Sequence, residues 1–335
     1  MTDAHTELLA RLGITPLALP VPFPDAGGPV NVYAIEEEGG GYCLFDTGIG
    51  GPEGERALEH AAATAGLTLR HVRRVIVSHG HVDHYGNAQH IAELSGARVR
   101  VHPKDWDKVV GDDRWAVQRP VYLEFFERLG VPKEGILHLE MLRQVNQAFS
   151  RRVDASHAET LQSGARLRFR HFEAEVVHLP GHTPGLVCLW DEAHRMFFAD
   201  DHVLARISPN PLLDLDERGY QDKFQALAAY LHSAKHVHAM DIDWVLPGHG
   251  APFQGHRRVL ESLFAFYAKR QKKIVEHLKA SPTTAYELIS VVFGRVDPLR
   301  LFLMLSEVVG NLEVLEAEGR LGRREKEGRW VFEAA

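Results

Sequence analysis

Four potential metal ligands lie within six residues of the chain, in the segment HGHVDH at 79–84. Alternate residues of an extended segment point to the same side, so His79 and His81 can bind one ion. Asp83 and His84 fall on the next bend and can face a second ion, at the separation of about 3.5–4 Å typical of two-metal sites. Neutral imidazole and carboxylate ligands suit zinc, iron or manganese. Four side chains are too few ligands for two ions, so the remaining ligands must come from elsewhere in the chain.

Three further segments with potential ligands each follow a short apolar run that predicts a strand. These segments are PGHTPG at 180–185, which contains His182, ADDH at 199–202, which contains Asp200 and Asp201, and PGHG at 247–250, which contains His249. In α/β sheets, ligands bind at the carboxyl ends of the strands. We therefore expect these segments to meet the segment at 79–84.

The surrounding pattern predicts a layered α/β fold, because short apolar runs alternate with helical spacing. The expected strands lie at 30–46, as a hairpin with glycines at its turn, and at 72–77, 98–101, 166–172, 174–179, 186–190, 196–199 and 244–246. The expected helices lie at 53–66, from the end of the polar loop at 78–86 to residue 94, and at about 220–238, 256–279, 281–293 and 297–318.

Two stretches depart from this alternation and set the expected organisation. Residues 103–155 have helical spacing and many aromatic side chains, which predicts a helical insertion within one domain. Residues 256–335 read as three helices followed by a hairpin, the order of a winged-helix module. We therefore expect a catalytic domain over 1–255 and a small C-terminal winged-helix-like domain over 256–335.

Over about residues 17–255 the chain resembles the metallo-β-lactamase-fold hydrolase superfamily. The motifs that carry the resemblance are HGHVDH at 79–84, PGHTPG at 180–185, ADDH at 199–202, PGHG at 247–250 and FDTG at 45–48. The resemblance implies a four-layer αββα sandwich that holds two divalent metal ions at one edge. We expect Zn²⁺, with iron and manganese as alternatives.

The resemblance also implies a role for each site residue. By position, the first ion would be bound by His79, His81 and His182, and the second by Asp83, His84 and His249. One aspartate would bridge both ions; the following His-Val-Leu aligns this role with Asp201, and Asp200 is the alternative. Asp46 would stand behind the ligands and orient a histidine through its other ring nitrogen.

Two cations that share one water bring its pKa toward neutrality, so a bridging hydroxide could attack a carbonyl carbon or a phosphorus. Asp83 is the expected proton acceptor. Neither Cys43 nor Cys188 lies in a ligand motif, unlike the cysteine common in true zinc β-lactamases. The chain looks most like the glyoxalase-II-like branch, which implies a thioester or activated-ester substrate of the acyl-CoA or acylglutathione type. A phosphodiesterase or endoribonuclease, a lactonase, and a metal-binding protein without turnover remain alternatives.

Composition limits the partners and the compartment. The 335-residue chain has 38 basic and 45 acidic residues, a formal net charge of −7, so no overall positive field attracts nucleic acid. The expected helix over 301–318 carries four glutamates and no lysine or arginine, which disfavours a DNA-reading role, although basic residues in the final hairpin keep RNA open. No run approaches the roughly 18 apolar residues of a membrane span, and there are only two cysteines. We expect a cytoplasmic enzyme with a small-molecule substrate, and a homodimer remains open.

Overall fold

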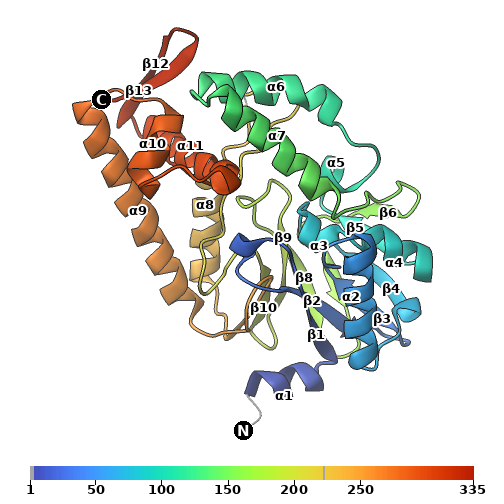
Figure 1. The fold of residues 1–335 in the computed structure, drawn as a ribbon. Helices are drawn as coiled ribbons and strands as arrows, with labels where there is room; N and C mark the ends of the chain where they lie inside the picture. The colour runs from blue at the N-terminus through green and yellow to red at the C-terminus, as the bar shows by residue number, and fades with distance from the viewer. Residues whose placement is uncertain (1–3, 222) are drawn as a thin grey trace.

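Two β-sheets lie face to face at the centre of this computed structural model, which describes residues 4–221 and 223–335 (Figure 1). The first sheet has the order β1-β2-β3-β4-β5-β6 and the second the order β11-β10-β9-β8-β7. The strands of the first sheet are β1 (Ile14–Leu19), β2 (Val30–Glu36), β3 (Tyr42–Phe45), β4 (Val72–Ile76), β5 (Arg98–Val101) and β6 (Ala158–Thr160). Those of the second are β7 (Arg166–Arg168), β8 (Glu173–His178), β9 (Val187–Asp191), β10 (Met196–Asp200) and β11 (Trp244–Pro247).

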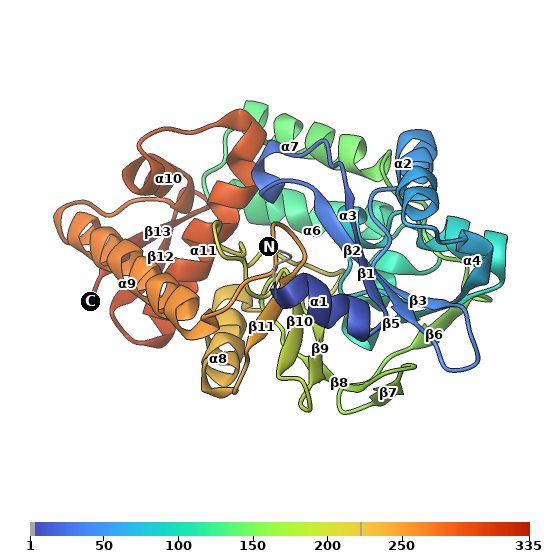
Figure 2. The same ribbon diagram turned by 90° about the horizontal axis from the view of Figure 1, so that it is seen from below.

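Helices cover the outer face of each sheet and complete four layers (Figure 2). On the first sheet lie α2 (Gly51–Thr64), α3 (Val82–Tyr85) and α4 (Ala88–Ser95), and on the second lie α8 (Ala226–Ala239) and α9 (His256–Ala280). A third apolar core fills the space between the sheets, where Phe45 and Tyr33 of one sheet meet Phe198 of the other. The αββα sandwich expected from the sequence is therefore confirmed.

Parallel strand pairs bring the candidate ligands to one edge of the sandwich. β3 and β4 are parallel with Phe45 opposite Ile76, and β10 and β11 are parallel with Asp200 opposite Pro247. The chain leaves each of these four strands at the same edge, immediately before or within a predicted site motif. β10 is buried along its whole length, in agreement with its nearly continuous apolar sequence, whereas β4 carries an exposed Arg73 and a half-buried Arg74 between its buried apolar residues.

The insertion predicted over 103–155 is helical. It contains α5 (Trp106–Val109), α6 (Trp115–Arg128) and α7 (Lys133–Gln147), after a short helical turn, η3 (Pro103–Asp105). The structure adds two elements that the sequence pattern did not indicate, α1 (Ala4–Arg11) and strand β1, together with the short strand β6. The helix expected from about residue 220 begins only at Ala226, and the strand expected over 166–172 ends at Arg168.

The C-terminal region, residues 256–335, has the predicted order of elements. After α9 come α10 (Ala285–Phe293), the short turn η4 (Pro298–Arg300), α11 (Leu301–Ala317) and the hairpin β12 (Leu321–Lys326) and β13 (Arg329–Ala334). Its likeness to a winged helix and the domain boundary at 255 remain predictions. Buried apolar side chains of α6 and α7, such as Phe125 and Leu139, share one cluster with Leu305 of α11 and Trp330 of β13. The insertion and the C-terminal region therefore have a common core.

No helix among the described residues is both long enough and apolar enough to cross a membrane.

One buried ion pair in the C-terminal region makes stability depend on pH. Arg270 of α9 lies 2.5 Å from Glu307 of α11, and its guanidinium lies between the rings of Phe266 and Phe293, 4.3 and 4.4 Å from their centroids. Burial raises the pKa of Glu307 to about 7, although Arg270 opposes the shift. The folded state thus holds a proton on Glu307 more tightly than the unfolded state does. This group therefore stabilises the fold below about pH 4.5, and its contribution is lost as the pH rises to about 7.

We expect the free energy of unfolding of the natural protein to fall relative to that of Glu307→Gln as the pH rises from 4.5 to 7, by about 3 kcal/mol at 1.36 kcal/mol per pKa unit. Urea unfolding of both proteins across this range measures the difference, in which all other titrating groups cancel. Glu276→Gln, on the exposed face of α9, is the matched control and should follow the natural protein. If the free energies of unfolding of the natural protein and of Glu307→Gln change in parallel with pH over this range, the pKa of Glu307 is not raised and this prediction is wrong.

Candidate metal centre

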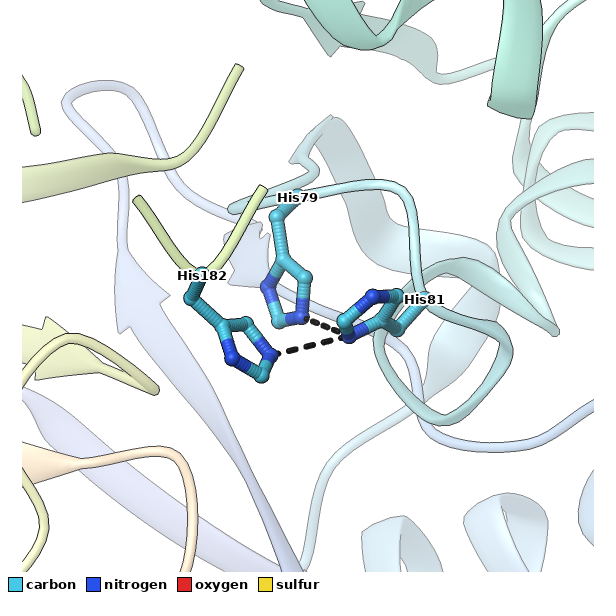
Figure 3. A group of neighbouring side chains, drawn as sticks. All are labelled: His79, His81 and His182. Carbon is cyan, nitrogen blue, oxygen red and sulfur yellow. Dashed lines mark hydrogen bonds between the residues drawn. The ribbon is translucent and has the colours of Figure 1, made fainter. Parts of the chain in front are cut away.

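Three histidines from two loops form the first group of candidate ligands (Figure 3). His79 and His81 follow β4, and His182 lies in the loop between β8 and β9. The Nε2 atoms of His79 and His182 each lie 2.9 Å from Nδ1 of His81. Three ring nitrogens this close to one another are an arrangement that a metal ion can fill.

Asp83, His84 and His249 form the second group. The short helix α3 begins immediately after His81 and places Asp83 and His84 on a single turn, while His249 follows β11. Oδ2 of Asp83 lies 3.4 Å from Nε2 of His249 and 3.8 Å from Nε2 of His84. Both triads therefore bring together the residues that the sequence grouped.

The adjacent aspartates Asp200 and Asp201 point in different directions. Oδ2 of Asp201 lies 3.5 Å from Nε2 of His84 and 3.5 Å from Nε2 of His182, so this carboxylate stands between the two triads. Asp200 instead lies behind the rings: its Oδ2 is 2.9 Å from Nδ1 of His79 and its Oδ1 is 3.2 Å from Nδ1 of His84. The geometry thus places Asp201 between the two triads and Asp200 behind the rings of His79 and His84.

Asp46 also orients His84. At the end of β3, its Oδ2 lies 3.0 Å from Nδ1 of His84 and accepts a hydrogen bond from the Ser78 hydroxyl, while its Oδ1 accepts from the Ser78 backbone N–H at 2.7 Å. Asp46 and Asp200 both have positive φ, 66° and 45°, a region that aspartate tolerates better than most residues. Burial and the charge of Asp200 raise the pKa of Asp46 to about 6.

Two more of the candidate ligand histidines are oriented by backbone carbonyl groups. Nδ1 of His182 donates to the carbonyl oxygen of Asn210 at 2.8 Å, and Nδ1 of His249 donates to that of Gly28 at 3.1 Å. With Nδ1 protonated, Nε2 presents a lone pair, which is the tautomer that a metal ligand needs. Asn210 is itself held by α11, because its side-chain amide donates to the carbonyl oxygen of Leu303 at 2.9 Å.

Asp105 positions both histidine loops, although no motif in the sequence marks it. This fully buried carboxylate accepts hydrogen bonds from the Gly80 N–H (2.9 Å), the Thr183 hydroxyl (2.6 Å) and the Gly185 N–H (3.0 Å). Lys108 adds a contact at 3.3 Å and, against the effect of burial, helps to keep the pKa of Asp105 below its usual value. The available signal was position: an acidic residue shortly after β5, a strand that ends at the site edge.

The loop that carries His249 is fixed from the first sheet. Asn31 donates to the carbonyl oxygens of Pro247 and Gly250, and the Tyr33 hydroxyl donates to Pro247 at 2.8 Å. Between them, Gly248 leaves no room for a side chain, because a Cβ there would overlap carboxylate oxygens of the aspartates at 200 and 201. The approach of this loop to the site therefore requires glycine.

The donor set fits two divalent ions. Nε2 of His84 and Oδ1 of Asp201 are buried and have no hydrogen-bond partner in the described structure. Burial and the neighbouring imidazoles lower the pKa of His182 to about 4, so its ring is neutral and can donate a lone pair. At the second triad the histidine pKa is shifted in the opposite direction. Burial lowers the pKa of His249, but the nearby carboxylates of Asp201 and Asp83 outweigh burial and raise it to about 9. That end of the site therefore favours positive charge, which a cation supplies.

A cavity of about 850 Å³ opens onto both triads. The residues of the two triads that line it, together with Asp201, are His81, Asp83, His182 and His249. A neighbouring cavity of about 670 Å³ shares the wall formed by Tyr122 and Arg143. The candidate ligands thus face a space large enough for a small-molecule substrate.

A family model described as the metallo-beta-lactamase superfamily matches residues 25–249 of this chain. The chain belongs to the metallo-β-lactamase superfamily. The probable metallo-hydrolase YqjP of Bacillus subtilis (strain 168) is 28% identical over 306 residues, which are 90% of this chain and 92% of that protein. The probable metallo-hydrolase YflN of the same organism is 26% identical over 178 residues, 52% of this chain and 61% of its own.

Solved structures share the fold of this superfamily member along nearly its whole length. The metallo-beta-lactamase family protein TTHA1429 from Thermus thermophilus has a TM-score of 0.79 at 24% identity and covers 96% of this chain and 99% of its own. A beta-lactamase domain protein from Burkholderia ambifaria has a TM-score of 0.78 at 23% identity, over 96% and 92%. Membership in the superfamily and the likeness to YqjP identify a metal-dependent hydrolase.

Proposed function

We propose that this metal-dependent hydrolase cleaves a small-molecule thioester or a similarly activated ester, of the acyl-CoA or acylglutathione type. The observation that carries the proposal is the pairing of two cavities at the site. The 850 Å³ cavity at the triads is lined mostly by apolar side chains, and the adjoining 670 Å³ cavity is lined by seven lysines and arginines against four aspartates. An acyl group joined to an anionic carrier has the same division of properties.

The proposed ligand set follows the geometry of the triads. One ion, for which we propose Zn²⁺, would be held by His79, His81 and His182, and the other by Asp83, His84 and His249, with Asp201 between them. When bound, two such ions lower the pKa of a shared water and stabilise an oxyanion.

Asp83 is the proposed proton acceptor, because its carboxylate lines the cavity beside His249. In the overall reaction, water adds its oxygen to the acyl carbon and the carbon–sulfur bond breaks. The thiolate then leaves and takes up the proton that Asp83 has held.

Lys104 is the cation best placed to meet an anionic carrier. It is exposed at the second cavity, next to the loop of His102. Arg114, at the same cavity, is engaged by Asp107 and Glu217, and Arg119 pairs with Glu140. The charges of these two arginines are therefore already largely compensated within the protein.

The structure gives less support to an RNA substrate. In the final hairpin and the turn before it, Arg320 pairs with Glu318, Arg323 with Glu316 and Arg324 with Glu333. These acidic partners reduce the positive field that a phosphate backbone requires. A cytoplasmic location fits the two cysteines, Cys43 and Cys188, which are both buried and free.

A substrate panel with metal removal tests the proposal. We expect the purified protein to release thiol from acyl-CoA or acylglutathione substrates, to lose at least about 100-fold of this rate when a chelator removes its metal, and to recover on addition of Zn²⁺. Lactones and bis(p-nitrophenyl) phosphate in the same panel represent the other reaction classes. If metal-loaded protein cleaves a lactone or the phosphodiester efficiently and neither thioester, the proposal is wrong.

A further inference from the structure

Much of the wall of the 850 Å³ cavity is built by elements that lie outside the β-sandwich. Leu123 and Phe126 of α6 and Leu139 and Leu142 of α7 line the cavity. The C-terminal region also contributes to the lining. Figure 1 shows α6, α7 and the start of α11 together above the edge of the sandwich where the strands end.

Five residues of the C-terminal region line the cavity: Asp297, Leu299, Arg300, Phe302 and Leu303. Leu299 lies in η4, and Phe302 and Leu303 lie in the first turn of α11. Phe302 packs against the core that α11 shares with α6 and α7. A second anchor is the hydrogen bond from Asn210 to the carbonyl oxygen of Leu303, so this part of the wall is fixed relative to the metal centre.

Apolar side chains make up most of the cavity lining. Those of α6 and α7 named above, together with Leu299, Phe302 and Leu303, are all aliphatic or aromatic, while Glu140, Arg143, Asp297 and Arg300 add charged groups to the wall. An occupant that gains free energy from such walls must itself be apolar and extend away from the reacting carbon. A short acyl group, such as acetyl, would leave most of this surface uncovered.

We infer that the substrate carries a medium- or long-chain acyl group and that Phe302 and Leu303 of the C-terminal region set the chain length that fits. This inference rests on the proposed thioester hydrolysis and adds the identity of the acyl part. It assigns the C-terminal region a role in substrate selection.

A chain-length series tests the inference. The substrates are N-acetylcysteamine thioesters with acetyl, butyryl, octanoyl, lauroyl and palmitoyl groups, so that only the acyl part changes. For the natural metal-loaded protein we expect kcat/KM to rise by about fourfold per buried methylene until the cavity is filled. Leu303→Trp should lower kcat/KM for the lauroyl and palmitoyl substrates at least tenfold and leave the butyryl value within about twofold.

Two further variants keep the result interpretable. Leu137→Trp makes the same change at an exposed site on α7 that does not line the cavity, and it should behave as the natural protein does. Val145→Trp lies at the cavity on the half-exposed side of α7, where a larger ring is easily accommodated, and replaces Leu303→Trp if that variant does not fold.

Binding of dodecanoate, measured by titration calorimetry, separates this inference from the proposed reaction. If thioesters are cleaved but kcat/KM does not change with chain length or with Leu303→Trp, the inference is overturned and the reaction stands. If no thioester is cleaved, but dodecanoate binds more tightly than acetate and Leu303→Trp alone weakens it, the apolar-chain site is supported and the proposed reaction is wrong.

Discussion

Replacing Asp83 by asparagine is expected to reduce kcat by about 10²–10⁴-fold, the usual contribution of a positioned general base. Asparagine keeps an oxygen that can face the second triad but cannot accept the proton. Oδ2 of Asp83 lies 3.4 Å from Nε2 of His249, and the side chain lines the cavity, so the carboxylate stands between the candidate ligands and the substrate space. The rate of thiol release, measured at saturating Zn²⁺, tests the expectation.

Metal content measured on the same sample separates two roles of Asp83. A lower kcat with two ions still bound identifies proton transfer as the missing function, whereas loss of one ion identifies Asp83 mainly as a ligand. Asp241→Asn is the matched control, because Asp241 is exposed between α8 and β11 and should leave both quantities unchanged. A variant at 83 that binds two ions and keeps its rate within about tenfold would rule Asp83 out as the general base.

The neighbouring aspartates are expected to differ sharply when each is changed to asparagine. Asp201→Asn should bind about one ion in place of two and lose roughly 10³-fold in kcat, because the carboxylate between the triads is the group that both ions would share. Asp200→Asn should weaken metal affinity by about 10–100-fold, the usual effect of losing a partner that orients a ligand histidine. Asparagine also tolerates the positive φ of Asp200, so the backbone is preserved.

Metal analysis at defined free Zn²⁺, followed by the rate of the reconstituted proteins, distinguishes the two variants. With excess Zn²⁺, Asp200→Asn should regain most of its activity and Asp201→Asn should not. If instead Asp201→Asn regains its activity and Asp200→Asn does not, Asp200 is the shared ligand. That result would contradict the observed positions, in which Asp200 contacts Nδ1 of His84 and Asp201 lies near Nε2 of the same ring.

The fold and the candidate ligands could be predicted because their signals are local. Each ligand segment is a short motif after an apolar run, and strand ends in a layered α/β fold meet at one edge. The final hairpin also follows a local rule: Glu327 and Gly328 both have positive φ, as its two-residue turn requires. Patterns of this kind are fixed by neighbouring residues and do not depend on distant contacts.

The missing parts depend on contacts between segments far apart in the chain. Asp105 lies in the helical insertion and has no motif around it, yet it joins the loops of Gly80 and Thr183. The apolar side chains of α6 and α7 predicted helices, but their sequence could not show that the partner for this face is the C-terminal region. Strand alternation likewise could not decide between Asp200 and Asp201, since φ of Asp200 lies outside the strand region.

Asn210 connects the C-terminal region to the candidate metal centre through two hydrogen bonds. Its side-chain amide donates a hydrogen bond to the carbonyl oxygen of Leu303 in the first turn of α11, and its backbone carbonyl oxygen accepts one from Nδ1 of His182. Any sliding of α11 that reshaped the substrate space would therefore also turn the imidazole of His182, a candidate metal ligand. Relatives that accept substrates of other sizes should therefore differ in the side chains of α11 and keep the position of the helix. A shift of the helix would also change the orientation of His182.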